Sequence, residues 1–264
     1  MITLGARVFG LGIIMLALVC LAFGNFDFGQ SVPREFPART VLAYVAAVFM
    51  LVAGVALEWQ RTVKWGAGAL AIYFALVVVV IMDGRQVIAH YSEYVIYSSV
   101  AAQLAVAAGA LIIYAGTVND PARAASLTRV GQVTFGLCAV LFGGAHFFYM
   151  NFTAPLVPKW LPPTQEFWGY ATGVFHIAAG LAIVTGVKAR LAAILLTIMY
   201  AVFTPLVHLP LLMADSSSHY VWSENALNLI LTGIAWVVAD SFDTRRASDS
   251  SFIRFRIDHS HSNS

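Results

Sequence analysis

Three histidines lie within long apolar segments of the sequence: His146, His176 and His208. Imidazole can donate or accept a hydrogen bond, bind a proton near neutral pH and ligate a metal ion. A helix rises about 1.5 Å per residue, which places His146 one turn from a helix end, His176 near mid-helix and His208 one to two turns from an end. The depths differ by about 10 Å on this spacing, so two of the histidines can share a cavity.

Three uses of these histidines are consistent with the sequence. Each can hydrogen-bond a neighbouring helix, which is a common use of polar residues in membranes. Alternatively, they bind a quinone or another amphipathic ligand, with a histidine donating to a carbonyl group between aromatic walls. Binding of a metal or haem is disfavoured because the spacing matches no local ligand motif, and no metal site is predicted. The candidate ligand-binding residues are His146, His176, His208, Tyr149, Trp168 and Tyr170.

A second polar group surrounds the start of the last apolar segment. Acidic residues beside histidine can bind a divalent cation, whereas Trp and Tyr at a helix end are typical of the membrane interface. Glu224 and Asn225 are expected to cap the last helix or to interact favourably with its dipole. The residues of this group are Glu166, Asp215, His219, Tyr220, Trp222, Glu224 and Asn225.

The composition indicates an integral membrane protein. Of 264 residues, 60% are apolar and 11% are charged, and the mean hydropathy is +0.80; soluble domains are far more polar. The net charge of +2 gives no indication of nucleic-acid binding. The cysteines, Cys20 and Cys138, form no CxxC pair, so thiol exchange is disfavoured.

Uncharged segments long enough to cross a bilayer predict eight helices. No Asp, Glu, Lys or Arg lies within the predicted helix interiors, which disfavours transport through buried carboxylates. The predicted spans are Arg7 to Gly24, Thr40 to Leu57, Lys64 to Met82, Tyr94 to Thr117, Leu127 to Met150, Phe167 to Val187, Leu191 to Met213 and Trp222 to Ala239.

The distribution of Lys and Arg predicts that both termini face the cytoplasm. With eight spans the termini share one side, and basic residues concentrate on the cytoplasmic side of membrane proteins. That side carries Arg7, Arg61, Lys64, Arg123, Arg129, Lys188, Arg190, Arg245, Arg246, Arg254 and Arg256, whereas the other carries Arg34, Arg39, Arg85 and Lys159.

The chain shows an internal duplication. Val32, Pro33 and Pro37 recur as Val157, Pro158 and Pro162, and the aligned helices share further residues, including Gln103 with Asn228 and His90 with His219. Two units of four helices make parallel repeats. The three histidines of the apolar segments lie in the second unit only; their counterparts in the first are Gly24, Met50 and Met82. We predict a first unit at residues 1–117, a linker at 118–126 where Asn119, Asp120 and Pro121 break the helix, a second unit at 127–242 and a disordered tail at 243–264.

The second unit resembles the DoxX family of small four-helix bacterial membrane proteins, and the first unit is a weaker copy. The resemblance covers about residues 130 to 240, and its residues are Gly144, His146, Phe147, Val157, Pro158, Leu161, Pro162, Gly173, Gly180, Ala192, Ala193, Phe203 and Pro205. It implies a fused double unit in the bacterial inner membrane and, from better-known members, association with quinone-linked redox enzymes. Relatives often carry an acidic residue where His176 stands, which puts in doubt any family role of that carboxylate.

The fold class expected is therefore all-α integral membrane, with eight transmembrane helices as two parallel four-helix repeats. The leading functional hypothesis is a membrane or quinone-site subunit that supports a soluble redox partner, and so at most a subunit of a quinone-linked oxidoreductase. The alternatives are a small-molecule or lipid transporter and a structural or assembly protein without a ligand. The expected partners are the lipid bilayer and the redox partner, and no nucleic acid.

Overall fold

Eight apolar helices form one bundle in the computed structural model, which describes the backbone of residues 2–261 and the side chains of residues 2–243. Each helix is long and apolar enough to cross a membrane. The described residues contain helices and connecting loops but no strand. The protein is thus an all-α multi-pass membrane protein, as its composition predicts.

The first four spans come from residues 4–115. They are α1 (Leu4–Phe23), α2 (Arg39–Leu57), a third span made of α3 (Val63–Ile72), a π-helical segment η1 (Tyr73–Met82) and α4 (Gly84–Ala89), and α5 (Tyr94–Ala115). In the next four, the third span is again interrupted by a π-helical segment. They are α6 (Pro121–Phe148), α8 (Gln165–Thr185), a third span made of α9 (Ala189–Phe203), the π-helical segment η3 (Thr204–His208) and α10 (Leu209–Ala214), and α11 (His219–His261). Two short segments, α7 (Met150–Thr153) and the 3-10 turn η2 (Ala154–Leu156), lie between α6 and α8.

The helix ends follow local sequence rules. The hydroxyl of Thr164 accepts a hydrogen bond from the Phe167 amide at 3.1 Å and caps α8, which carries His176. Gly186 ends the same helix in the left-handed conformation that glycine tolerates. Asp120 caps α6, and Pro121 occupies its first turn, where a missing amide hydrogen costs nothing.

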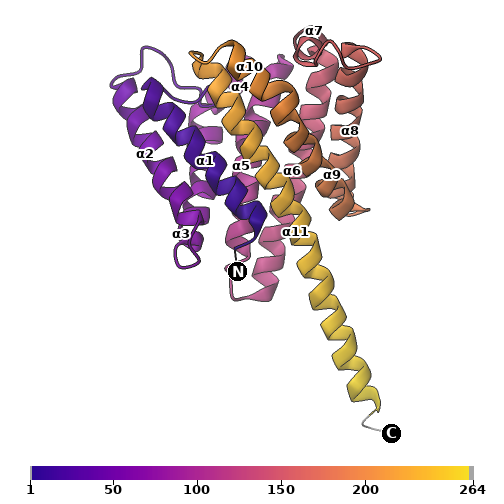
Figure 1. Cartoon of the computed structure of the whole chain (residues 1–264). Coiled ribbons are helices and arrows are strands. Elements are labelled where there is room, and N and C mark those ends of the chain that lie inside the picture. Colours follow the sequence, from indigo (N-terminus) through magenta and orange to yellow (C-terminus); the bar gives the residue numbers. More distant parts are fainter. Residues whose placement is uncertain (1, 262–264) are drawn as a thin grey trace.

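Each half of the bundle has the same order of helix contacts. The first helix packs on the second, the second on the third span, and the third span on the fourth helix. The first helix of each half also packs on the last helix of the other half, so α1 runs beside α11 (Figure 1) and α6 beside α5. A parallel duplication would produce this order of contacts, and that relation between the halves remains a prediction.

Two ends of the bundle can be distinguished in Figure 1. We call the end that carries α4, α7 and α10 the distal end. At the opposite end α1 begins and α11 leaves the bundle, so the chain enters and exits on one side. This arrangement is the one that an even number of spans requires.

Two helix boundaries lie near the predicted linker and tail, and the predicted division of the chain into units stays a prediction. Pro121 begins α6 instead of breaking a helix, so the connection between the halves lies at residues 116–120 and is shorter than the predicted linker at 118–126. The α11 helix continues to His261, through the segment for which the sequence predicts disorder, and that segment contains neither Gly nor Pro to end a helix.

Candidate ligand-binding site

All three intramembrane histidines line one cavity of about 180 Å³ in the second half of the bundle. The cavity lies between α6, α8, the third span and α11. Sequence reasoning allowed two of the histidines to meet there. His208 is the third residue at the cavity. It lies at the end of η3, in the part of the third span between α9 and α10. The lining residues are Phe142, His146, His176, Tyr200, Phe203, His208, Glu224, Leu227, Asn228 and Leu231.

Close contact between α6 and α8 holds His146 and His176 side by side. A methyl group on Gly180 would lie 2.4 Å from the Gly136 carbonyl oxygen, and one on Gly143 would lie 2.6 Å from that of Gly173. Only glycine fits at these positions, since a side chain would push the helices apart. The ring centres of the two histidines are consequently 5.3 Å apart.

Thr172 orients both imidazole rings. His176 Nδ1 lies 2.8 Å from the carbonyl oxygen of Thr172, and His146 Nδ1 lies 3.2 Å from the hydroxyl oxygen of the same residue. A carbonyl oxygen can only accept, so His176 Nδ1 carries the hydrogen. The Thr172 hydroxyl donates its one hydrogen within α8, to the carbonyl of Trp168 or Gly169, and it therefore accepts from His146 Nδ1.

This pattern fixes what the rings offer to a ligand. When a neutral imidazole carries its hydrogen on Nδ1, the lone pair is on Nε2. His146 and His176 in their neutral forms therefore present hydrogen-bond acceptors at Nε2. The sequence-based expectation that a histidine donates to a carbonyl group requires the other tautomer or a protonated ring. The geometry instead suits a ligand with hydroxyl groups.

Tyr200 and His208 add further polar atoms to the cavity. The Tyr200 ring lies 5.5 Å from that of His176, between centres. Its hydroxyl group is buried, as is Nδ1 of His208, and neither atom has a hydrogen-bond partner among the described residues. Buried polar atoms are usually paired, so both are available to a ligand or to water.

The π-helical segment η3 is stabilised by two asparagines of α11. Pro205 has no amide hydrogen and cannot satisfy a carbonyl in the preceding turn. Asn228 Nδ2 donates instead to the Tyr200 carbonyl at 3.1 Å and lies 2.9 Å from Thr204 Oγ1. Asn225 Nδ2 donates to the His208 carbonyl at 3.1 Å. The irregular helix that carries His208 is thereby fixed against α11.

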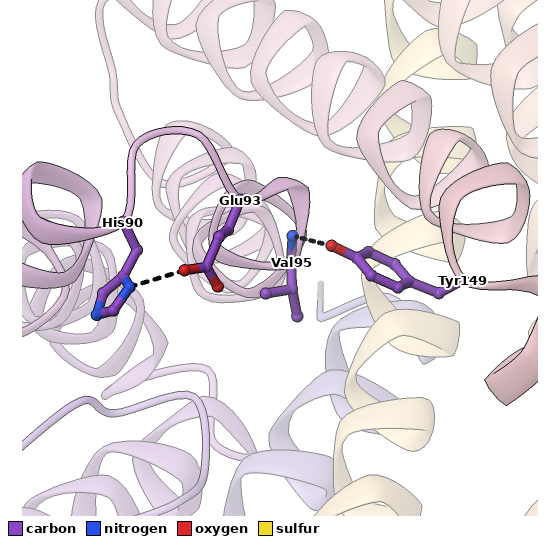
Figure 2. A network of polar contacts seen from close by, with 4 residues as sticks. All are labelled: His90, Glu93, Val95 and Tyr149. Carbon is purple, nitrogen blue, oxygen red and sulfur yellow. Dashed lines mark hydrogen bonds and ion pairs between the residues drawn. The ribbon is translucent and has the colours of Figure 1, made fainter.

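The aromatic residues predicted for the site lie elsewhere. The Tyr149 hydroxyl accepts a hydrogen bond from the Val95 amide at 3.0 Å, beside the pair formed by His90 and Glu93 (Figure 2). This contact connects α6 to the start of α5. Trp168 Nε1 donates to the Pro162 carbonyl at 2.8 Å. The Tyr170 ring, itself exposed, lies 5.5 Å from that of Phe147. None of the three lines the histidine cavity.

Sequence reasoning assigned the wrong setting to Glu224 and missed other residues of the cavity. The α11 helix begins at His219, so Glu224 lies in its second turn and lines the cavity instead of capping the helix. Thr172 could have been found from its position four residues before His176 on the same helix face. No local pattern in the sequence predicted that Tyr200 and Asn228 line the cavity. A single polar side chain on an apolar helix can face any of several neighbouring helices.

The first half of the bundle also contains buried polar residues, and one of them corrects the expectation that no carboxylate lies within a helical span. Asp83 lies within the continuous third span, between η1 and α4, and is 1% exposed. Asp27, Gln30 and Gln103 are 8%, 3% and 2% exposed. Carboxylates are therefore buried in this bundle, and polarity is not confined to the second half. Each half of the bundle thus contains a polar cluster, and the two clusters are built from different residues.

Burial raises the pKa of Asp27, which lies in the loop between α1 and α2. Removal of the carboxylate from water is the main cause, and hydrogen bonding from the Gly29 amide opposes it. The ionised form of this side chain is therefore costly where it stands. Within the described residues, no group of three or more His, Cys, Asp or Glu side chains is placed to hold a metal ion.

The fold and the cavity together define a class: a multi-pass membrane protein with a polar, aromatic-walled cavity between its helices. Comparison with known families adds one match. A family described as a domain of unknown function, DUF8561, matches residues 135–239, from mid-α6 to the end of the spanning part of α11. The match covers less than half of the chain and includes every residue that lines the cavity. No curated protein and no solved structure matches the chain.

Proposed function

We propose that the protein binds the aromatic head group of a quinol in the histidine cavity and serves as a membrane subunit of a redox enzyme. The observation that carries this proposal is the pair of imidazoles, His146 and His176, held by Thr172 with both Nε2 atoms free to accept hydrogen bonds. A quinol head group has two hydroxyl donors on one ring. The resemblance of the second half to the DoxX family supports the same proposal.

The size and walls of the cavity are consistent with such a head group. Pockets for whole drug-sized ligands occupy about 300–1,000 Å³, whereas a cavity of about 150 Å³ accommodates benzene. At about 180 Å³, the cavity fits one substituted ring. Phe142 and Phe203 contribute aromatic walls, and Leu227 and Leu231 contribute apolar ones. An isoprenoid tail would remain outside, among the lipid chains.

The chemistry assigned to this chain is binding and proton acceptance. Oxidation of one quinol to a quinone releases two protons and two electrons. The Nε2 atoms of His146 and His176 would accept the hydroxyl hydrogens, and Glu224 at the cavity wall offers a further proton acceptor. The electrons would pass to a redox centre of the partner protein. We place the protein in the bacterial inner membrane with both termini cytoplasmic, as the basic residues favour.

A binding assay tests this function. The full-length protein in lipid nanodiscs would be titrated with a short-tailed ubiquinol analogue and with its oxidised quinone under anaerobic conditions. The quinol should bind more tightly than the quinone. Replacement of His176 by Ala should weaken quinol binding by about fivefold to 150-fold, the range for a hydrogen bond worth about 1–3 kcal/mol. His90→Ala is the matched control, because His90 is exposed and distant in sequence from the cavity.

Equal binding by wild type and His176→Ala, with both variants folded, would contradict the proposed site. Mass spectrometry of proteins and lipids that co-purify in mild detergent tests the second part of the proposal. A soluble dehydrogenase or sulfur-oxidising enzyme in the complex would support the role as a redox subunit, and its quinone-dependent activity should fall with His176→Ala. A ligand-free protein without partners would count against it.

Transport is the second candidate, and one observation favours it. The third span of each half is interrupted by a π-helical segment, Tyr73–Met82 in the first half and Thr204–His208 in the second. Interrupted helices at corresponding positions of two repeats mark the substrate site in many transporters. Uptake of a small molecule into proteoliposomes, without any redox partner, would favour transport over the quinol site.

A further inference from the structure

The polar cluster of the first half surrounds a single tight turn at residues 27–31. The Gly29 amide donates to Asp27 Oδ2 at 3.0 Å, and the Ser31 amide donates to Asp83 Oδ1 at 3.1 Å. Gln30 projects from the same turn, where its Nε2 lies 3.6 Å from the sulfur of Met50. The turn after α1 thus brings two carboxylates and one amide together with the third span.

Gln103 of α5 points its amide group at this turn. A methyl group on Gly29 would lie 1.8 Å from Gln103 Nε2 and 3.1 Å from Asp27 Oδ2. The absence of a side chain at Gly29 therefore makes room for the Gln103 amide beside the Asp27 carboxylate. In the aligned position of the second half, Asn228 lines the histidine cavity. The two polar clusters thus share one register on the fourth helix of each half.

Several oxygen atoms of this cluster have no partner. Asp83 Oδ2, Gln103 Oε1 and Gln30 Oε1 are buried without a hydrogen bond among the described residues. Each of these side chains is at most 3% exposed. Buried polar atoms without partners are rare in folded proteins, and such atoms usually contact a bound ligand, water or ion. All three atoms are acceptors, so the missing partner must be a donor or a cation.

The charges of the cluster are also unbalanced. Neither Asp27 nor Asp83 forms an ion pair with Lys or Arg in the part of the chain whose side chains are described. An unpaired buried carboxylate costs several kcal/mol, and it is tolerated when it is protonated or when it binds a cation. Carboxylate, amide and hydroxyl oxygens are the ligands that hard cations prefer.

We propose that Asp27, Gln30, Asp83 and Gln103 form a binding site for a hard metal cation coordinated by oxygen atoms. The site contains two carboxylates, so the two positive charges of Ca²⁺ would neutralise it fully. Na⁺ is the monovalent cation that also prefers oxygen ligands. It is separate from the histidine cavity and independent of the quinol proposal. Asp27 is close enough to Glu224, at the cavity wall, for their charges to interact. A bound cation would therefore change the electrostatic environment of Glu224.

Thermal unfolding of the full-length protein tests the site. The protein would be freed of metal with a chelator, and the unfolding midpoint would be followed by tryptophan fluorescence during titration with CaCl₂ or with NaCl. Choline chloride would keep the ionic strength constant. One of the two cations should raise the midpoint in a saturable manner, and isothermal titration should give one ion per chain. The cation that saturates identifies the natural class.

Three variants make the test specific. Asp83→Asn should abolish the cation-dependent shift. Gly29→Ala should reduce the apparent affinity at least tenfold, because the added methyl group displaces the Gln103 amide, and it provides the test if Asp83→Asn fails to fold. Glu93→Gln is the control, since Glu93 is an exposed acidic residue directly before α5, the helix that carries Gln103, and it should retain the full shift. The proposal would be overturned if neither cation moved the wild-type midpoint, or if Asp83→Asn and Gly29→Ala both responded as the wild type does.

Discussion

Replacement of Thr172 by Val tests the arrangement of the histidine cavity most directly. Valine has nearly the same shape as threonine but lacks the hydroxyl group that His146 Nδ1 contacts at 3.2 Å. The bond from His176 Nδ1 to the Thr172 carbonyl involves the backbone and should persist. The variant thus releases one imidazole and leaves the other in place, without opening a cavity between α6 and α8.

The expected loss follows from one hydrogen bond. A neutral hydrogen bond contributes about 1 kcal/mol net, which corresponds to about a fivefold change in dissociation constant. Thr172→Val should therefore weaken binding of the short-tailed quinol about fivefold, less than His176→Ala does. Thr172→Ser keeps the hydroxyl group and should bind as the wild type does. Both variants would be assayed in nanodiscs by calorimetric titration.

Two results would refute this reasoning. An unchanged quinol affinity in Thr172→Val would mean that the orientation of His146 has no part in binding. A loss of the same size in Thr172→Ser would mean that the methyl group, and not the hydroxyl group, is what matters. Circular dichroism and size-exclusion chromatography would establish that each variant retains the helical content and monodispersity of the wild type.

Three further predictions concern packing and charge. Gly180→Ala should lower the folded fraction seen by size-exclusion chromatography, because its methyl group would meet the Gly136 carbonyl at 2.4 Å; normal elution and midpoint would contradict the close contact. Asn228→Leu should lower the unfolding midpoint by the equivalent of about 1–3 kcal/mol, since the Tyr200 carbonyl loses its donor, and Asn228→Asp should not restore it. Burial raises the pKa of Glu58 while Arg7 opposes the shift. Ionisation of Glu58 therefore lowers the stability of the fold as pH rises from about 4 through the raised pKa. Glu58→Gln should raise the unfolding midpoint at pH 8 and leave it unchanged at pH 4. The same gain at both pH values would show that charge is not the cause.

The spans themselves were readable from the sequence. Uncharged apolar segments must form helices in a bilayer because each backbone polar group needs a partner inside its own segment. The predicted starts and ends agree with the structure within a few residues for α2 and α8, where charged or capping residues mark the ends. Pro121 misled the boundary prediction because proline both ends helices and begins them.

The polar clusters were only partly readable. Histidines stand out on apolar helices, so His146 and His176 were identified, but their tautomers depend on the orientation of Thr172 across two helices. Asp83 appeared to lie beyond a span because the prediction ended this span at the charged residue, whereas the helix resumes directly after Asp83 as α4. Asp27 is buried by the tertiary fold of a loop, which no local pattern reports.

The crossed contacts of the first and last helices have a consequence for the stability of each half. Because α1 covers α11 and α6 covers α5, each set of four helices leaves two of its helix faces for the other set to bury. A chain with only one such set would expose those faces to lipid unless a second copy met them in the same membrane. Each half therefore needs the other to bury these faces, as two associated subunits would, and the short connection at residues 116–120 keeps the two halves together in one chain.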